Sequence, residues 1–136
     1  MHAIDEGKRP LQSILYVDDE PDIREIVQMA LTLEGDLTVH TAESGMDALR
    51  LIPKLKPDLV LLDAMMPQLD GTGTLKQIRA SKPTASTPVI FVTAKAMPQE
   101  VERFVGMGAA GVIAKPFDPM KLREQVLAMW ESLQDV

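Results

Sequence analysis

Short segments suited to β-strands alternate with amphipathic helical patterns along this chain, and that alternation constrains the fold more than any other feature. The five segments are Ile14–Val17, Leu37–His40, Leu59–Leu62, Val89–Val92 and Val112–Ala114. A continuous apolar run such as Ile14–Val17 is typical of a strand buried on both faces of a sheet. Leu37–His40 alternates apolar and polar residues instead, which predicts a half-exposed strand at the edge of the sheet.

Each strand segment is followed by apolar residues at helical spacing, and Pro21 occupies the first-turn position of the first such helix. We expect the second helix to close at Pro53 or shortly after, and the fourth to stop at Gly106 and Gly108. Strands joined through helices pair in parallel, and right-handed crossovers place the helices on both faces of the sheet. The sequence therefore predicts an α/β fold, a doubly wound five-stranded parallel sheet in three α/β/α layers.

Residues 1–11 are polar and lack periodicity, so we expect a flexible N-terminal arm before a single domain that spans residues 12–134. The 136-residue chain has no cysteine, which excludes disulfides, zinc–thiolate sites and a cysteine nucleophile. Its net charge of -6 argues against direct binding of nucleic acid or of an anionic membrane.

Membrane insertion and export are not expected either. No apolar run approaches the ~20 residues that span a bilayer, and the first residues lack the basic and apolar regions of a signal peptide. The expected location is cytoplasmic.

Polar residues directly follow four of the five strand segments. They are Asp18 and Asp19 after the first strand, Asp63 after the third, Thr93 after the fourth and Lys115 after the fifth. In open parallel sheets, binding sites form outside the carboxyl ends of the strands. One site would thus hold three carboxylates, a hydroxyl and an ammonium group.

The charge of this predicted site is minus two, because three carboxylates face one lysine. Crowded carboxylates repel one another, and a divalent cation would cancel the excess. Oxygen ligands favour Mg²⁺ (or Mn²⁺) over zinc or copper, and Mg²⁺ keeps coordination positions for phosphate oxygens. Asp63 is the best candidate for a nucleophile that forms an acyl phosphate. Lys115 and Thr93 would then contact the phosphoryl oxygens.

Four motifs support a resemblance to a known family. They are Tyr16-Val17-Asp18-Asp19-Glu20-Pro21, Leu62-Asp63-Ala64-Met65-Met66-Pro67 with Asp70-Gly71, Val92-Thr93-Ala94 and Lys115-Pro116-Phe117. In this order and spacing, they resemble the receiver domain of two-component response regulators, in particular the stand-alone, chemotaxis-receiver-like kind. The resemblance covers about residues 12 to 134. It implies the flavodoxin-like strand order 2-1-3-4-5.

The resemblance also implies individual roles. Asp63 would be phosphorylated by a sensor histidine kinase or a phosphotransfer protein. Asp19 and Asp63 would bind Mg²⁺ directly, the backbone carbonyl of Met65 would be a third ligand, and Asp18 would act largely through water. The Lys115–Pro116 bond would be cis, and Met65 and Lys95 would tune hydrolysis of the aspartyl phosphate.

One position departs from the family pattern. Receivers commonly carry Tyr or Phe three residues before the lysine, and that aromatic side chain turns inward when the threonine moves toward the phosphate. This chain has Val112 there. The departure does not affect the expected phosphorylation, but it puts the usual aromatic step of signal output in doubt.

Three other functions can be compared with the same residues. A phosphatase with an aspartyl-phosphate intermediate would need a general acid two residues after the nucleophile, where this chain has Met65. A flavin-binding electron carrier would need a hydroxyl- and glycine-rich phosphate loop, where Asp18-Asp19-Glu20-Pro21 would repel phosphate. A receiver that is never phosphorylated and serves as a scaffold stays open. We expect a phosphoacceptor signalling domain rather than an enzyme.

The sequence says least about how the chain passes on its signal. No segment with an output function follows the fifth helix, so we expect signalling through phosphorylation-dependent binding of a downstream protein or through a phosphorelay, unless the chain is part of a larger protein. The expected oligomeric state is a monomer or a weak dimer.

Overall fold

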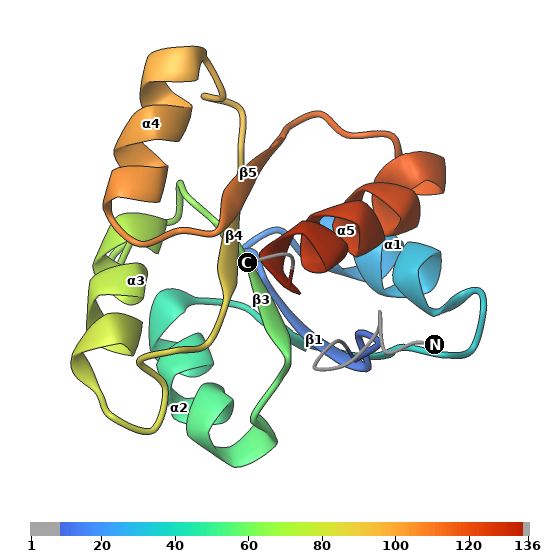
Figure 1. The fold of residues 1–136 in the computed structure, drawn as a ribbon, viewed down its shortest axis with the longest axis horizontal. Coiled ribbons are helices and arrows are strands. Elements are labelled where there is room, and N and C mark those ends of the chain that lie inside the picture. Colours follow the sequence, from blue (N-terminus) through green and yellow to red (C-terminus); the bar gives the residue numbers. More distant parts are fainter. Residues whose placement is uncertain (1–8, 135–136) are drawn as a thin grey trace.

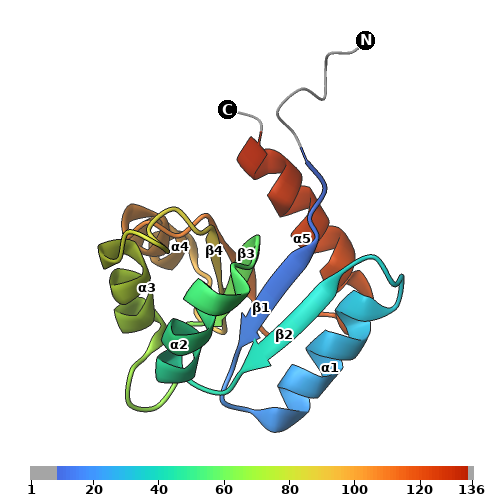
Figure 2. The same ribbon diagram turned by 90° about the horizontal axis from the view of Figure 1, so that it is seen from below.

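The computed structural model describes residues 9–134, in which five strands alternate with five helices. The elements are β1 (Ser13–Val17), α1 (Pro21–Thr32), β2 (Thr38–Ala42), α2 (Gly45–Leu55), β3 (Leu59–Asp63), α3 (Gly71–Ala80), β4 (Val89–Thr93), α4 (Pro98–Gly106), β5 (Gly111–Ala114) and α5 (Pro119–Gln134). All neighbouring strands pair in parallel, in the order β2-β1-β3-β4-β5. Figure 1 labels β1, β3, β4 and β5 of this sheet, and Figure 2 shows β2 beside β1. The predicted fold class and strand order are confirmed.

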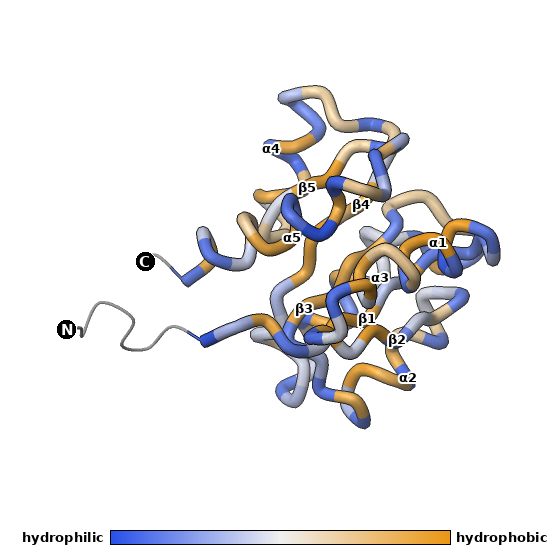
Figure 3. Tube along the Cα trace, turned by 90° about the vertical axis from the view of Figure 1, so that its right-hand side faces the viewer, coloured by the Kyte–Doolittle hydropathy of each residue, from blue (hydrophilic) through white to orange (hydrophobic). Residues whose placement is uncertain are grey.

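The helices form two layers around the sheet, as Figure 2 shows. Apolar side chains of α1 and α5 pack on one face, among them Val27 and Val126. Side chains of α2, α3 and α4 pack on the other face, among them Ile52, Leu75 and Phe104. Because both faces are covered, every residue of β3 and of β4 is buried. Figure 3 shows hydrophobic residues along the central strands, which is the composition that burial on both faces requires.

The strand β2 lies at the edge of the sheet and is half-exposed, as its alternating sequence predicted. Thr38 and His40 are exposed, whereas Val39 and Ala42 are buried. The helix α2 continues two residues beyond Pro53, and Lys56 then closes it in a left-handed conformation with φ of 47°. The helix α4 ends at Gly106, as the sequence predicted.

The last residues of the expected N-terminal arm differ from the prediction. The backbone N–H of Arg9 donates to the Gln134 side-chain oxygen, at 2.9 Å, and its carbonyl accepts from the side chains of Gln134 and Trp130. Leu11 is buried in the core beside α5. These contacts fix residues 9–11 to the end of α5, which a reading of local sequence could not anticipate. Residues 1–8 of the expected arm lie outside the described residues.

Candidate functional site

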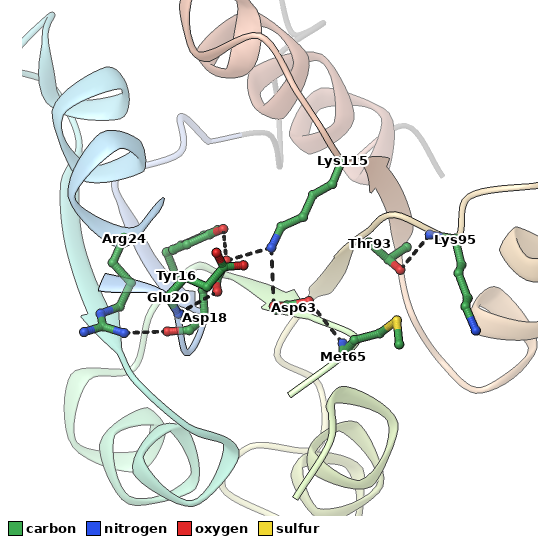
Figure 4. Close-up of polar contacts among 9 residues, drawn as sticks. All are labelled: Tyr16, Asp18, Glu20, Arg24, Asp63, Met65, Thr93, Lys95 and Lys115. Carbon is green, nitrogen blue, oxygen red and sulfur yellow. Dashed lines mark hydrogen bonds and ion pairs between the residues drawn. The ribbon is translucent and has the colours of Figure 1, made fainter. Parts of the chain in front are cut away.

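Parallel pairing brings the polar ends of four strands to one edge of the sheet. Asp63 is the last residue of β3 and pairs in register with Val92, so Thr93 lies one residue further along β4. Asp18 and Asp19 directly follow β1, and Lys115 directly follows β5. Residues from four strands therefore meet in one place, as the sequence predicted (Figure 4).

Lys115 links two of the carboxylates. Its Nζ lies 2.9 Å from Asp18 Oδ2 and 3.3 Å from Asp63 Oδ2. Asp18 is fully buried and Asp63 is 4% exposed. Two nearly buried carboxylates thus share one ammonium group, which leaves the site with an excess of negative charge even before the exposed Asp19 is counted.

Further hydrogen bonds hold Asp18. The Tyr16 hydroxyl donates to Asp18 Oδ2 at 2.7 Å, and the Glu20 N–H donates to Oδ1 at 3.0 Å. The Arg24 guanidinium donates to the backbone carbonyl of Asp18 at 2.8 Å. Sequence reasoning assigned no role to the Tyr16 side chain, which it named only within an apolar strand and at the start of the first motif. The available signal was its spacing, since residues two apart on a strand point to the same face.

The loops after β3 and β4 each donate a backbone hydrogen bond to the side chain at the end of the preceding strand. The Met65 N–H donates to Asp63 Oδ1, and the Lys95 N–H donates to the Thr93 hydroxyl, both at 3.0 Å. The Thr93 carbonyl accepts the backbone N–H of Lys115 at 2.8 Å. Thr93 is buried and lines, with Ala64, Met65 and Lys95, a cavity of about 200 Å³. Its side chain is thus beside the carboxylate cluster and engaged with its own loop (Figure 4).

Burial and neighbouring charges together shift the pKa values of the site. Burial raises the pKa of Asp63, and the Met65 N–H and the Lys115 ammonium oppose that shift only in part. Burial alone would lower the pKa of Lys115, but its hydrogen bond to Asp18 and the charges of Asp18 and Asp63 raise it above its ordinary value. Burial and the adjacent Asp18 also raise the pKa of Tyr16. At neutral pH, Lys115 is therefore a cation and Tyr16 a neutral phenol that can donate.

The three carboxylates fit a divalent metal ion. Asp18, Asp19 and Asp63 can each direct one oxygen so that the three atoms lie within 4.8 Å of one another. These oxygens are hard ligands, and Asp19 is exposed, so an ion can reach them from solvent. The geometry suits a metal site.

The start of α3 presses against the strand end that carries Asp63. A Cβ atom at Gly71 would lie 2.5 Å from the carbonyl oxygen of Asp63 and 2.6 Å from the Cα atom of Ala64. The Gly71 N–H donates to the Ala64 carbonyl, and the Asp70 side chain caps the helix through the Gly73 N–H. Only glycine permits this close approach, which explains the Asp70-Gly71 pair in the motif.

The expected cis peptide bond is present between Lys115 and Pro116. Val112 lies on β5 in register with Phe91, and the Phe91 ring packs against Phe104 of α4 with ring centroids 4.6 Å apart. The aromatic side chain next to this part of β4 thus comes from α4, whereas β5 contributes a valine. Across residues 9–134, no helix has the length and apolar character needed to cross a bilayer.

Comparisons with known proteins agree with this geometry. The family model of the response regulator receiver domain matches residues 14–127. The chain is 39% identical over 110 residues to the response regulator Rre1 of Synechocystis, which covers 81% of this chain and 48% of that protein. It is 38% identical over 120 residues to the probable transcriptional regulator ycf27 of Guillardia theta, covering 87% of this chain and 45% of that protein.

The chain therefore spans about half the length of these curated relatives. Among solved structures, the chemotaxis protein CheY4 of Vibrio cholerae superposes with a TM-score of 0.79 at 29% identity, covering 88% of this chain and 98% of that one. The family match, the relatives and the fold agree: this chain belongs to the response regulator receiver domain family.

Proposed function

We propose that Asp63 accepts a phosphoryl group in a Mg²⁺-dependent reaction and that the chain signals through its phosphorylated state. The observation that carries this proposal is the shared Lys115 ammonium, which lies within 3.3 Å of a nearly buried Asp63 carboxylate at a strand end. Membership of the receiver family supports the same role. The phosphoryl donor would be a sensor histidine kinase or a phosphotransfer protein.

The reaction needs no general base, because an ionised carboxylate is already a nucleophile. An oxygen of Asp63 attacks phosphorus, the bond between phosphorus and the donor histidine nitrogen breaks, and the electron pair stays on the imidazole. The Met65 N–H and the Lys115 ammonium, one on each carboxylate oxygen, hold Asp63 in a fixed orientation. The protein thus acts mainly by positioning and by charge compensation, as is general for phosphoryl transfer.

Two side chains are placed to receive the transferred group. Lys115 can turn from the carboxylates to a phosphoryl oxygen, since its Nζ already lies between Asp18 and Asp63. The Thr93 hydroxyl accepts a hydrogen bond from Lys95 and still has its own proton to donate. We therefore assign Thr93 and Lys115 to the phosphoryl oxygens.

The proposed metal ligands are Asp18, Asp19, Asp63 and the backbone carbonyl of Met65. Hard oxygen ligands and an excess of negative charge favour Mg²⁺, for which Mn²⁺ could substitute. When bound, Mg²⁺ supplies positive charge that offsets the charge on the phosphoryl oxygens. The proposed output is binding of a downstream protein target or a phosphorelay. The proposed location is the cytoplasm.

Acetyl phosphate tests the phosphoacceptor role directly. The protein is incubated with acetyl phosphate and Mg²⁺, and its intact mass is measured. We expect one added phosphoryl group that hydroxylamine removes, as it does an acyl phosphate, and that EDTA prevents. The adduct should be absent from Asp63→Asn and present in Asp36→Asn, which changes an exposed aspartate remote from the site. If neither acetyl phosphate nor a histidine kinase produces an adduct, the scaffold function is favoured. Turnover of a small phosphate ester would favour an enzyme.

Asp19→Asn tests the metal site. Asp19 is exposed, so the variant should fold normally. Wild-type protein should gain about 1.4 kcal/mol of unfolding free energy when Mg²⁺ is present at ten times its dissociation constant. Asp19→Asn should gain much less at the same concentration, whereas Glu131→Gln, an exposed change on α5, should match wild type. Equal stabilisation of all three proteins would exclude Asp19 as a ligand.

A further inference from the structure

The hydroxyl group of Tyr16 has a place in the site that the proposed function does not yet use. Tyr16 is the only tyrosine in the sequence, and its side chain is fully buried. Its ring belongs to the apolar cluster between the sheet and the α1–α5 layer. The hydroxyl reaches out of that cluster at the strand end and donates to Asp18 Oδ2 at 2.7 Å (Figure 4). A phenylalanine would fill the same apolar space, so apolar packing alone does not account for the hydroxyl.

The hydrogen bonds to Asp18 show what the hydroxyl does. A carboxylate has about four lone-pair positions. In Asp18, Tyr16 and Lys115 occupy two of them on Oδ2, and the Glu20 N–H occupies one on Oδ1. The remaining position is on Oδ1. The donors therefore determine which oxygen of Asp18 can face a metal ion or its water.

A phosphoryl group on Asp63 would compete with Asp18 for the Lys115 ammonium. The Lys115 Nζ is shared between Asp18 and Asp63, and a phosphoryl group on Asp63 adds oxygens that attract the same ammonium. Among residues 9–134, Tyr16 is the only other side chain that donates to the Asp18 carboxylate. When Lys115 turns to the phosphoryl group, Tyr16 is the side chain that keeps Asp18 oriented.

We propose that Tyr16 is a positioning residue of the phosphoryl-transfer site, whose hydroxyl holds Asp18 in the orientation that serves the metal ion while Lys115 moves to the phosphoryl group. This role rests on the proposed function, and it acts through Asp18 rather than on the reacting atoms. If the hydrogen bond were purely structural, loss of the hydroxyl would change only the stability of the fold. In a positioning role, its loss also changes metal binding and phosphorylation.

Tyr16→Phe removes the hydroxyl and leaves the ring in place. We expect its dissociation constant for Mg²⁺, measured by calorimetry on the folded protein, to rise about tenfold, as is typical when a partner of a metal ligand is removed. We also expect slower phosphorylation by acetyl phosphate at saturating Mg²⁺.

Thr84→Val is the matched control, because it also removes one buried hydroxyl hydrogen bond. The Thr84 hydroxyl donates to the Ile78 carbonyl at 2.7 Å, in the connection after α3. Both variants should lose stability to urea, but Thr84→Val should keep the wild-type dissociation constant for Mg²⁺ and the wild-type rate of phosphorylation. If Tyr16→Phe also keeps both values, Tyr16 is structural only and the proposal is wrong.

Wild-type protein provides a second measurement that does not depend on the variant's folding. Tyrosine labelled with ¹³C at Cζ gives a single NMR signal, because the chain has one tyrosine. On phosphorylation, the signal should shift in the direction of a stronger hydrogen bond, since Tyr16 no longer shares Asp18 Oδ2 with Lys115. An unchanged signal in phosphorylated protein would overturn the positioning role and leave the proposed function intact. A wild-type protein that neither binds Mg²⁺ nor accepts a phosphoryl group would overturn both.

Discussion

The ammonium group of Lys115 lies closer to Asp18 than to Asp63, at 2.9 Å from the first carboxylate and 3.3 Å from the second. The lysine thus neutralises the same negative charge that a metal ion would neutralise. Lys115 and a bound cation therefore oppose each other electrostatically, although the proposed function assigns both to phosphoryl transfer.

Lys115→Met tests this opposition. We expect Mg²⁺ to bind at least about tenfold more tightly, because removal of a unit charge a few ångströms away is worth more than about 1.4 kcal/mol at the effective dielectric constant of a partly buried site. Phosphorylation by acetyl phosphate should nevertheless become slower. Calorimetry and intact-mass measurements check the two expectations. Lys76→Met, at an exposed position of α3, should change neither value, and weaker Mg²⁺ binding in Lys115→Met would contradict the opposition.

Asp58 should make the free energy of unfolding depend on pH in the acidic range. Its carboxylate accepts from the Arg9 guanidinium at 2.8 Å and from the backbone N–H groups of Gln12 and Ser13. Burial alone would raise the pKa of Asp58, but these hydrogen bonds together hold the pKa below its ordinary value. The ionised form is therefore favoured in the folded state. Its stabilisation is fully present above the unfolded-state pKa of about 3.9 and is lost as the pH falls through the lower folded-state pKa.

Urea unfolding at neutral pH and at about pH 3, below the ordinary aspartate pKa of ~3.9, measures this effect. Asp58→Asn should be less stable than wild type at neutral pH, and the difference should shrink in acid. Asp36→Asn is a useful comparison, because Asp36 is exposed and its pKa is also lowered, through a surface hydrogen bond with Arg123. A constant difference between wild type and Asp58→Asn across this pH range would exclude the linkage.

Gly71→Ala should disturb both the fold and the site. The added methyl group would lie 2.5 Å from the carbonyl oxygen of Asp63, and backbone atoms cannot move aside easily. We expect a loss of about 1–3 kcal/mol in unfolding free energy, the usual cost of overpacking, and slower phosphorylation of Asp63. Gly106→Ala is the control, because a Cβ atom there meets open space. It should be neutral or stabilising by up to about 1 kcal/mol, and similar losses in both variants would contradict the steric explanation.

Arg79 joins two connections that are distant in sequence. Its guanidinium donates to the carbonyls of Ala85, at 3.1 Å, and Thr87, at 2.7 Å, both before β4, and to that of Gly108, at 2.9 Å, before β5. Arg79→Met removes three hydrogen bonds from a charged group and should cost about 2–3 kcal/mol of unfolding free energy.

Arg50→Met is the matched control for Arg79. Arg50 pairs with Asp47 on the surface of α2, and such exposed pairs contribute only about 0–1 kcal/mol. Urea unfolding of both variants compares the two arginines. If Arg79→Met is no less stable than Arg50→Met, the guanidinium does not hold the two connections together.

Much of the fold and of the candidate site could be predicted from sequence, because the relevant signals are local. An apolar run such as Leu59–Leu62 predicts a buried strand, and the aspartate that follows it is then at the carboxyl end of that strand. The parallel pairing rule places Asp63 beside Asp18 and Lys115, although Lys115 is 52 residues from Asp63. No knowledge of side-chain packing is needed for that step.

Other contacts could not be predicted, because they depend on how side chains pack across elements. In a run of apolar residues, Tyr16 looks like any core aromatic residue, and only the folded chain shows that its hydroxyl meets Asp18. The contact between Arg9 and Gln134 joins positions 125 apart, and nothing near either residue signals it.

The sequence by itself determined the alternation of strands and helices, and with it the strand ends at which Asp18, Asp19, Asp63, Thr93 and Lys115 gather. Only the tertiary structure decided that Lys115 is shared between two carboxylates, that Tyr16 supports one of them, and that the Thr93 hydroxyl binds its own loop. The physical reason is range. Periodicity acts over a few neighbouring residues, whereas the direction and partner of a buried polar group depend on every element packed around it.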